Sequence, residues 1–600
     1  MRTSAKFSNL LAVFELPLRS EAVFFVMLLV MWGPYTWLAL SSCLFSLTWQ
    51  SPFYDRLIYF ASYTFLLSYL CTAAVSLTRW RWLKVALYIV SLLNFGTYLF
   101  LKFNFHTMLT PDVLQAVLET NPSETADFWR QYLLARGSLM AYAGVLVMVA
   151  VIVFAERWWS QHGRQGKPSV WLGGCVLVGL LACCWCLRPF IKMLRCQTVE
   201  ELEVCEIYGS DLWGGDNFTT YAYSVHTLRV GIGEIQHALE VTCHELDAGK
   251  AQRLSPNDSL TVVVVIGETY IKSHCGLYGY SLNTTPRMNR ERTAGNLWVF
   301  EDVISPFNYT SISLKNALSC NSIGHGERWS DTPLLMAVMR RAGFDVYAWD
   351  NQLNYFKGAL FSFALNGLLY HERLRNNCYT AVSEKCFDYD EQLVDDYLNS
   401  QWNKQQTKAK LVTFHLMGQH FKASERYPHE QKWQHFTPDS VRSSASWLTD
   451  IKRQEIAEYD NATRYNDHVL GRIFDAWRDK NAVVIYFADH GEEIYDWRDF
   501  AGRDESSNKL PEAIIYQNSV PMVVWCSNRY LQLHPDVNQR LEQGRIQPLM
   551  HDNVCQIIFN LAQVVTPFYH PDRDPLSDQF RPSKRLVYDH IDYDSLFCKP

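Results

Sequence analysis

The chain has 600 residues, a formal net charge of −6 and 16 cysteines. This length exceeds that of one ordinary domain, and the small net charge gives no indication of a nucleic-acid partner. So many cysteines are unusual for a cytosolic enzyme and favour an oxidising compartment, although six of them lie in apolar stretches, where cysteine behaves as a small apolar residue.

Five long apolar stretches occupy the first 190 residues. They cover about 21–47, 57–78, 83–103, 137–155 and 170–189. Each is long enough, or nearly so, to cross a hydrocarbon layer of about 30 Å as a helix of roughly 20 residues. A buried soluble helix explains any single stretch, but five in succession predict a transmembrane domain of five α-helices over residues 1–190.

Basic residues mark one side of these predicted spans. Three precede the first span, three separate the second from the third, and three separate the fourth from the fifth: Arg2, Lys6, Arg19, Arg79, Arg81, Lys84, Arg157, Arg164 and Lys167. Because Lys and Arg are retained in the cytoplasm, we expect a cytoplasmic N-terminus and a multi-pass inner-membrane protein. Everything after about residue 190 then lies in the periplasm of a Gram-negative bacterium. The first span lacks a convincing cleavage site and is expected to be retained.

Two segments connect these spans to the rest of the chain. Residues 109–129 lie outside the membrane in this topology. Their apolar residues recur at helical spacing after Pro111, and this pattern predicts a short amphipathic helix on the membrane surface. Residues 191–258 are polar and irregularly patterned, and they are interpreted as a linker with bridging helices.

Residues 259–600 alternate short apolar strands with helical segments, which is typical of an α/β domain. The predicted strands cover 261–266, 344–349, 410–416, 481–488 and 520–525. A helical pattern over 450–477 leads directly into the fourth of these strands. We therefore expect a periplasmic α/β/α domain that starts at about residue 259.

Candidate metal ligands follow two of these strands. Glu268 comes directly after the β-branched run 261–266, and Asp489 and His490 come directly after 481–488. In open α/β sheets, ligands bind beyond the carboxyl ends of the strands, so these three side chains are expected to converge. Two carboxylates and an imidazole suit a divalent ion such as zinc.

A hydroxyl beside such an ion becomes a nucleophile, and Thr310 is the candidate. It precedes a predicted helix whose N-terminus would stabilise a developing anion or a bound phosphate. The alternative is an N-cap threonine without a catalytic role.

Further candidates also lie at strand ends. His420 follows the strand 410–416 and is a candidate for proton transfer or phosphate positioning, with a solvated loop residue as the alternative. Asp350, Asn351 and Gln352 follow the strand 344–349 and are candidates for substrate contact, although an Asx turn explains them equally well. Cys378 and Cys386 close a short loop and are the best candidates for a disulfide.

An ordered set of motifs makes the chain recognisable. Read in chain order, it comprises Gly267-Glu268-Thr269, Tyr278-Gly279-Tyr280, Asn283-Thr284-Thr285-Pro286, Tyr309-Thr310, Met417-Gly418-Gln419-His420, Tyr459-Asp460-Asn461 and Ala488-Asp489-His490-Gly491-Glu492. With the five spans, this set resembles the phosphoethanolamine transferases of the bacterial inner membrane, in the alkaline phosphatase and sulfatase superfamily.

The resemblance implies a role for each matching residue. Glu268, Thr310, Asp489 and His490 match the family's zinc site, which implies one zinc ion, with a second one possible. Thr310 matches the threonine that becomes covalently phosphorylated, and His420 matches a histidine near the substrate phosphate or a second metal. Thr120 and Glu124 match positions near the membrane that help to hold the lipid head group, and the Cys378–Cys386 pair resembles a family disulfide.

The implied reaction transfers phosphoethanolamine from phosphatidylethanolamine to Thr310 and then to an envelope glycan, either lipopolysaccharide core or lipid A. The sequence Phe307-Asn308-Tyr309-Thr310 replaces the Cys-Gly-Thr of lipid A-modifying members, so the chain is closer to members that modify the lipopolysaccharide core. Family members also place a histidine shortly after Asp-His-Gly, whereas none occurs here between His490 and His534. That role is either lost or taken by a residue such as Asp499.

Three other readings compete with this one. A sulfatase needs a Cys-x-Pro-x-Arg type context for its nucleophile, and none occurs near residue 310. A glycerol-phosphate transferase resembling lipoteichoic acid synthase also joins five spans to a metal-threonine domain. A non-catalytic membrane protein that senses lipid or lipopolysaccharide would be expected to lose part of the metal set, and here that set is complete.

Overall fold

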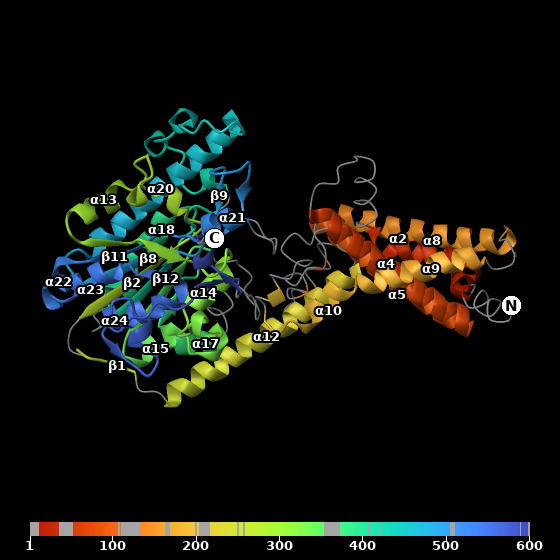
Figure 1. The fold of residues 1–600 in the computed structure, drawn as a ribbon, viewed down its shortest axis with the longest axis horizontal. Helices are drawn as coiled ribbons and strands as arrows, with labels where there is room; N and C mark the ends of the chain where they lie inside the picture. The colour runs from red at the N-terminus through yellow and green to blue at the C-terminus, as the bar shows by residue number, and fades with distance from the viewer. Residues whose placement is uncertain are drawn as a thin grey trace. The chain divides into compact units, whose positions relative to one another are not determined.

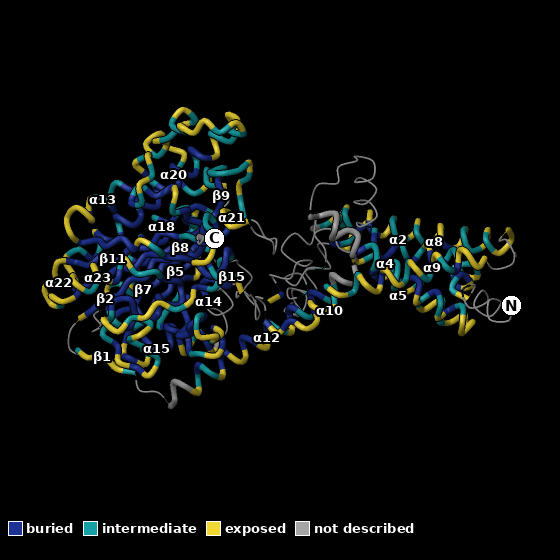
Figure 2. The backbone as a smooth tube through the Cα atoms, viewed as in Figure 1, coloured by how far each residue is buried: buried dark blue, intermediate teal, exposed yellow. Residues whose placement is uncertain are grey.

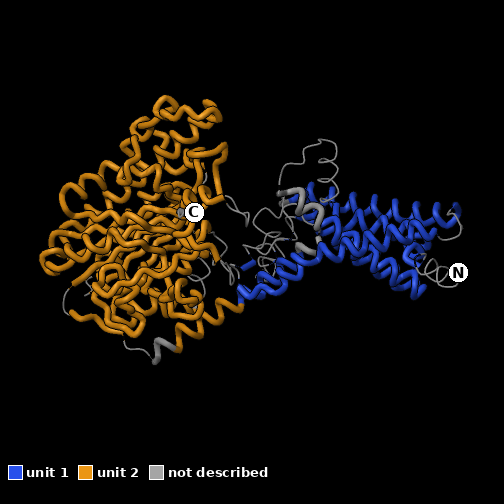
Figure 3. Tube along the Cα trace, viewed as in Figure 1, with its two compact units in different colours: residues 1–232 blue, residues 233–600 orange. Residues whose placement is uncertain are grey.

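The structure is a computed structural model of the chain. It describes residues 11, 13–34, 52–105, 109, 114, 133–162, 169–198, 201–202, 217–248, 251–255, 259–352, 372–405, 409–420, 422–503, 510–588 and 590–597. The chain divides into two compact units, residues 1–232 and 233–600, which are coloured separately in Figure 3.

The first unit consists of helices. Those described are α2 (Ala22–Trp32), α4 (Pro52–Thr78), α5 (Arg81–Phe105), α8 (Arg136–His162), α9 (Val170–Trp185) and α10 (Arg188–Arg195). Four helical segments are long and apolar enough to cross a membrane: Phe60–Thr78, Arg81–Asn104, Arg136–His162 and Val170–Arg195. The first of the five predicted spans is described only as α2, which is shorter, and residues 35–47 lie outside the described part of the chain.

A charged cluster joins three helices of this unit. Lys84 on α5 lies 2.6 Å from a carboxylate oxygen of Glu21, just before α2, and 2.7 Å from one of Glu156 on α8. Tyr88, one turn further along α5, donates a hydrogen bond of 2.6 Å to Glu156. Ionisable groups on apolar helices are costly unless they are paired, so this cluster fixes the three helices against one another.

The predicted linker region contains helical structure where it is described. α12 (Asn217–Ala248) is a continuous helix of 32 residues, and the boundary between the two units falls within it. It is followed by the short strand β1 (Gln252–Arg253), which pairs with β13 (Val564–Val565).

A seven-stranded sheet forms the centre of the second unit (Figure 1). Its order is β3 (Leu297–Phe300), β11 (Met522–Cys526), β8 (Ala482–Ala488), β2 (Leu260–Gly267), β7 (Ala409–His415), β5 (Asp345–Asp350) and β6 (Ala381–Val382). The strands from β8 to β6 are parallel, and β11 runs antiparallel to both β8 and β3. All five strands predicted from the sequence are confirmed within one or two residues.

Helices cover both faces of this sheet, which explains the nearly continuous apolar runs of its parallel strands. One face carries α13 (Pro286–Thr293), α18 (Asp390–Asn399) and α20 (Asp450–Trp477), and the other carries α14 (Thr310–Ala317), α15 (Leu335–Arg341) and α24 (Val554–Leu561) (Figure 1). The central strands are accordingly buried (Figure 2). The α/β architecture predicted for residues 259–600 is confirmed.

The register of the central strands positions the candidate ligands. Gly267 at the end of β2 pairs with Ala488 at the end of β8, so Glu268 and Asp489 leave the sheet side by side. Ile266 pairs with His415 on the other neighbour of β2, which brings the loop containing His420 to the same edge. The carboxyl ends of three parallel strands therefore meet at one site.

The disulfide prediction is wrong for this structure, because Cys378 has a free, buried thiol. The residues between Cys378 and Cys386 do not form a compact loop. Ala381 and Val382 add the strand β6 to the sheet, and the N–H groups of Thr380 and Ser383 donate hydrogen bonds to residues of β5. This extended backbone places the two cysteines along the edge of the sheet without joining them. Burial raises the pKa of the Cys378 thiol to about 12.

Candidate metal and nucleophile site

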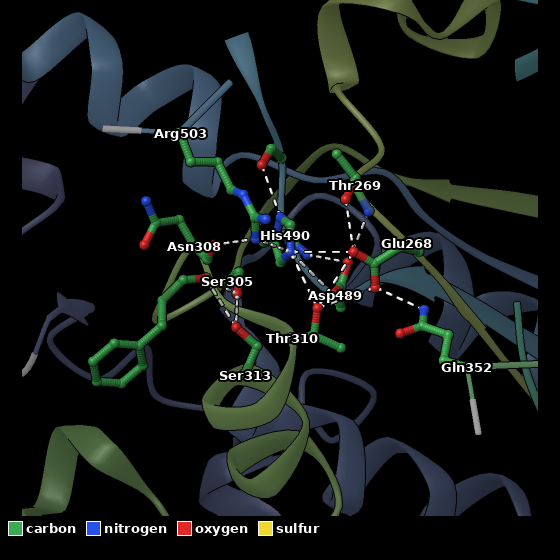
Figure 4. Close-up of polar contacts among 12 residues, drawn as sticks. Glu268, Thr269, Ser305, Asn308, Thr310, Ser313, Gln352, Asp489, His490 and Arg503 are labelled. Atoms are coloured by element: carbon green, nitrogen blue, oxygen red, sulfur yellow. Dashed lines mark hydrogen bonds and ion pairs between the residues drawn. The ribbon is translucent and has the colours of Figure 1, made fainter. Parts of the chain in front are cut away.

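Glu268, Asp489 and His490 converge at the carboxyl edge of the sheet, as their positions after strands predict (Figure 4). One ligand atom from each lies within 4.8 Å of the others, and all three side chains are fully buried. The Nε2 atom of His490 lies 3.5 Å from Oε1 of Glu268 and 3.2 Å from Oδ2 of Asp489. Among the described residues this is the group with donor atoms arranged to hold a metal ion.

Thr310 points into the same group (Figure 4). Its hydroxyl lies 3.1 Å and 3.3 Å from the two carboxylate oxygens of Glu268 and 3.3 Å from Nε2 of His490. The N-cap of α14 is Tyr309, and Thr310 is the first residue inside the helix. The Thr310 hydroxyl therefore does not cap the helix, and the positive end of α14 lies beside it.

His490 presents an available lone pair to the site. Its Nδ1 atom lies 2.9 Å from the carbonyl oxygen of Gly491 and donates its N–H there, which leaves Nε2 as the acceptor nitrogen. Burial, followed by the charge of Arg503, lowers the pKa of His490 below its ordinary value. The imidazole is therefore neutral near pH 7, the form in which histidine binds metals.

The two carboxylates have opposite pKa shifts. Burial alone would raise the pKa of Glu268, but a hydrogen bond and attraction from the protonated form of His490 outweigh it and hold that pKa well below its usual range. Burial and the negative charge of Glu268 raise the pKa of Asp489 well above its usual range. Two buried carboxylates this close cannot both ionise unless a cation compensates them.

This donor set fits a zinc ion. Oδ2 of Asp489 is buried and has no hydrogen-bond partner, which is costly unless a cation binds there. Glu268, Asp489, His490 and the Thr310 hydroxyl provide oxygen and nitrogen donors of the kinds that zinc accepts, and four is its usual number of ligands.

Backbone contacts hold the carboxylates in place. Oδ1 of Asp489 accepts hydrogen bonds of 2.9 Å from Thr269 N–H and 2.7 Å from His490 N–H. Thr269 has a positive φ of 55° and donates its hydroxyl to Glu268 at 2.7 Å. The Tyr459 hydroxyl donates to the carbonyl oxygen of Thr269 at 2.7 Å, which fixes this strained turn.

Gly418 allows the loop after β7 to pass close to the site. Its φ is +48°, and a Cβ atom there would lie 2.8 Å from the backbone nitrogen and oxygen of Glu268. Only glycine permits this approach without moving the end of β2.

Two further residues belong to the site: Gln352, which the sequence makes a candidate for substrate contact, and Arg503, which sequence reasoning missed. Gln352 donates hydrogen bonds of 2.8 Å both to Oε2 of Glu268 and to the carbonyl oxygen of Leu416, so it orients the carboxylate. Arg503 donates to Nε2 of His490 at 3.0 Å (Figure 4). Gln352 is a candidate because it follows a predicted strand, whereas the polar segment around Arg503 carries no local signal.

Asn351 requires a correction. Its side chain is buried, its amide N–H donates to Asp390 at 2.9 Å, and its amide oxygen accepts from Phe387 N–H at 2.7 Å. Both polar groups of the Asn351 side chain therefore join segments of the fold. The neighbouring Gln352 reaches the site instead.

The remaining predicted residues have different outcomes. His420 is half-buried and close enough to Glu268 for their charges to interact, and burial lowers its pKa despite that attraction. Asp499 lies outside the site, where it is exposed and pairs with Lys452. Thr120 and Glu124 lie outside the described residues, as does nearly all of the segment 109–129.

Two family models match the chain. The model described as Sulfatase matches residues 260–564, and the one described as Phosphoethanolamine transferase EptA/EptB matches residues 67–200. Together they cover parts of both compact units.

Individual proteins extend these matches. The phosphoethanolamine transferase EptC of Escherichia coli O18:K1:H7 is 26% identical over 510 residues, which are 81% of each chain. The Kdo(2)-lipid A phosphoethanolamine 7''-transferase of Salmonella typhimurium is 31% identical over 286 residues, 46% of each chain. Among solved structures, the integral membrane protein lipooligosaccharide phosphoethanolamine transferase A of Neisseria meningitidis shares the fold, with a TM-score of 0.50, 17% identity and coverage of 95% of this chain and 99% of that one.

Three findings agree with the family that the sequence motifs indicate. The α/β unit matches the sulfatase model, the helical unit matches the transferase model, and a phosphoethanolamine transferase matches over four fifths of the chain. This chain is an enzyme of the phosphoethanolamine transferase family, in the alkaline phosphatase and sulfatase superfamily.

Proposed function

We propose that this enzyme transfers phosphoethanolamine from phosphatidylethanolamine to Thr310 and then to lipopolysaccharide, either its core or lipid A. The main evidence for this proposal is the position of the Thr310 hydroxyl, which lies within 3.3 Å of both the Glu268 carboxylate and Nε2 of His490. A hydroxyl beside a cation-binding group is the arrangement required for an activated oxygen nucleophile.

Glu268, Asp489, His490 and Thr310 are proposed to hold one zinc ion. Bound there, zinc would supply positive charge that lowers the pKa of the coordinated hydroxyl. Gln352 would keep the Glu268 carboxylate oriented, and the Gly491 carbonyl would keep Nε2 of His490 facing the site. A second ion remains a prediction carried by the family resemblance.

In the first step, the Thr310 hydroxyl loses its proton as its oxygen attacks the phosphorus of the donor. The P–O bond to diacylglycerol breaks, and the leaving oxygen takes up a proton, so that diacylglycerol is released as an alcohol. The N-terminus of α14 stabilises negative charge that develops on the phosphoryl oxygens. In the second step, an acceptor hydroxyl attacks the same phosphorus and releases Thr310. His420, whose lowered pKa keeps it neutral near pH 7, is proposed to take the proton of the acceptor hydroxyl.

The proposed location is the bacterial inner membrane, with five spans in residues 1–190, a linker over 191–258 and a periplasmic catalytic domain over 259–600. In this arrangement the donor lipid never leaves the bilayer. The apolar helices and the relatives of the helical unit support this proposal, and the basic residues between the spans support a cytoplasmic N-terminus.

Headgroup transfer by the full-length enzyme tests the proposal. Zinc-loaded protein would be incubated with phosphatidylethanolamine in vesicles, and diacylglycerol release and the mass of the Thr310 peptide would be measured. We expect diacylglycerol and a phosphoethanolamine adduct on Thr310. Thr310→Ala should abolish both, whereas Thr293→Ala, which removes an exposed hydroxyl outside the site, should retain both.

Two results would count against the proposal. Diacylglycerol release from phosphatidylglycerol but not from phosphatidylethanolamine would favour a glycerol-phosphate transferase. Equal zinc content in wild type and Asp489→Ala would show that the metal lies elsewhere.

A further inference from the structure

Arg503 reaches His490, which lies beside the nucleophile, from the segment that follows Asp489 and His490 (Figure 4). Its Nη1 atom donates to Nε2 of His490 at 3.0 Å and to the carbonyl oxygen of Asn308 at 3.1 Å. The Thr310 hydroxyl lies 3.3 Å from that same Nε2 atom. The guanidinium is therefore next to the oxygen on which a phosphoryl group would be carried.

No carboxylate pairs with Arg503 within the part of the chain that the structure describes. Arg498, five residues earlier, shows the usual alternative, because it forms two hydrogen bonds of 2.7 Å and 2.6 Å with the carboxylate of Glu493. The positive charge of Arg503 thus remains available to an anion.

Nε2 of His490 has one lone pair, and it can bind either a metal ion or an N–H of Arg503. The Nδ1 nitrogen offers no second acceptor, because it carries the proton donated to Gly491. A metal ion held by Glu268, Asp489 and His490 would therefore release the Arg503 N–H from Nε2. That donor would be freed a few ångströms from Thr310, while the Asn308 carbonyl still anchors the guanidinium.

We propose that Arg503 binds the phosphoryl oxygens of the group transferred through Thr310 and becomes free to do so when the metal takes the lone pair of His490. This inference rests on the proposed function and adds a phosphate-binding residue to it. It also assigns a residue to the place where the family pattern has a histidine, since residues 491–533 contain none.

Arginine suits this position because its guanidinium is planar and presents five N–H donors in a fixed fork. One edge of the guanidinium can stay on the Asn308 carbonyl while the other faces two phosphoryl oxygens. Such paired hydrogen bonds fix the orientation of the phosphoryl group in addition to compensating its negative charge. A lysine would supply charge without the fork, so Arg503→Lys separates the two contributions.

Binding of inorganic phosphate to the zinc-loaded full-length protein tests the inference without the lipid reaction. Wild type, Arg503→Ala and Arg503→Lys would be compared by calorimetry, with zinc content measured by atomic spectroscopy. Arg442→Ala is the matched control, because it removes an exposed arginine that lies outside the site. We expect Arg503→Ala to retain zinc and to bind phosphate about tenfold more weakly or worse, with Arg503→Lys between it and wild type.

Transfer kinetics provide a second readout. If Arg503 contacts the phosphoryl group in the transition state, Arg503→Ala should lower kcat by about 100-fold or more, since losing one such donor has that effect in other enzymes. Unchanged phosphate affinity in zinc-loaded Arg503→Ala would overturn the inference, as would an absence of phosphate binding to wild type. Failure of the proposed function would look different, because wild type would then bind phosphate at Arg503 but transfer no headgroup from phosphatidylethanolamine.

Discussion

His274 is a buried imidazole held between two carboxylates, close to the turn that carries Glu268. Its Nδ1 atom lies 2.8 Å from Asp460 and its Nε2 atom 3.2 Å from Asp496. Burial alone would lower the pKa of His274, but the charges of Asp496 and Asp460 outweigh it and raise that pKa to about 10. The ring is therefore an imidazolium at neutral pH, and it joins α20 to the segment after Asp489.

This raised pKa predicts a defined pH dependence of stability. Because the folded-state pKa is about 10 and the unfolded one about 6.5, the stabilisation is complete below pH 6.5 and is lost as the pH rises towards 10. We expect His274→Asn to lower the free energy of unfolding at pH 7 by about 3 kcal/mol, because the buried Asp460 and the partly buried Asp496 lose their partner. Thermal unfolding of the full-length protein in detergent between pH 6.5 and 10 would measure both effects.

The control is His429→Asn, which removes an exposed imidazole. It should keep the wild-type dependence on pH, whereas His274→Asn should show a flatter profile across the same range. A His274→Asn protein with the stability and pH profile of wild type would show that the ring is neutral in the folded state.

At the scale of elements, the motif Tyr459-Asp460-Asn461 on α20 acts as a scaffold. Tyr459 accepts a hydrogen bond from Ile271 N–H at 2.8 Å and donates to Thr269, and Asp460 holds His274. Asn461 accepts hydrogen bonds from two backbone N–H groups of the segment at 435–436. One helical turn thus positions two separate segments, 269–274 and 435–436, near the carboxyl edge of the sheet.

The sequence predicts those parts of the site that depend on a local sequence pattern and on the rule that ligands bind at the carboxyl ends of parallel strands. Glu268, Asp489 and His490 follow apolar strands directly, so their convergence requires only that parallel strands end at one edge. Gln352 and Asn351 are adjacent amides after a strand, and local sequence cannot tell which one faces Glu268. Arg503 reaches His490 through long-range packing of a polar segment, which has no periodic signal.

A cysteine pair links the helix of the nucleophile to a distant helix. Cys320 follows α14, Cys555 lies in α24, and their sulfur atoms are 3.4 Å apart and buried. In an oxidising compartment we expect Cys320 and Cys555 to form a disulfide. The two thiols then pass two electrons and two protons to a disulfide oxidant such as oxidised glutathione, which is reduced. The crosslink should stabilise the fold by about 3 kcal/mol, because it constrains the unfolded chain.

Peptide mapping without reduction would detect this bond as a joined pair of peptides that separates on reduction. Cys526, which is buried with a free thiol, provides the control and should be alkylated after denaturation whether or not oxidant was present. If Cys320 and Cys555 are both alkylated after oxidation and denaturation, the bond does not form. Thermal unfolding with and without reductant would measure its contribution to stability.

At the scale of the whole molecule, an apolar helical unit and an α/β unit share one chain, and the proposed chemistry needs both on defined sides of a membrane. The helices of the first unit expose many large apolar side chains, which suits contact with lipid. Trp80 lies between two candidate spans and Trp82 at the start of the second one, where aromatic side chains occupy the membrane–water interface. Arg79, Arg81 and Lys84 surround them, which favours the cytoplasmic side.

This orientation predicts opposite accessibility for two engineered cysteines. Trp82→Cys lies at the start of the candidate span Arg81–Asn104 and should be protected from a membrane-impermeant maleimide in intact spheroplasts, whereas Asp439→Cys on the α/β unit should be labelled. Both positions are exposed, so burial within the protein does not explain a difference between them. Labelling is measured above the wild-type signal from native cysteines, and permeabilised cells should label both variants. Labelling of Trp82→Cys in intact spheroplasts would reverse the orientation and place the α/β unit away from a periplasmic acceptor.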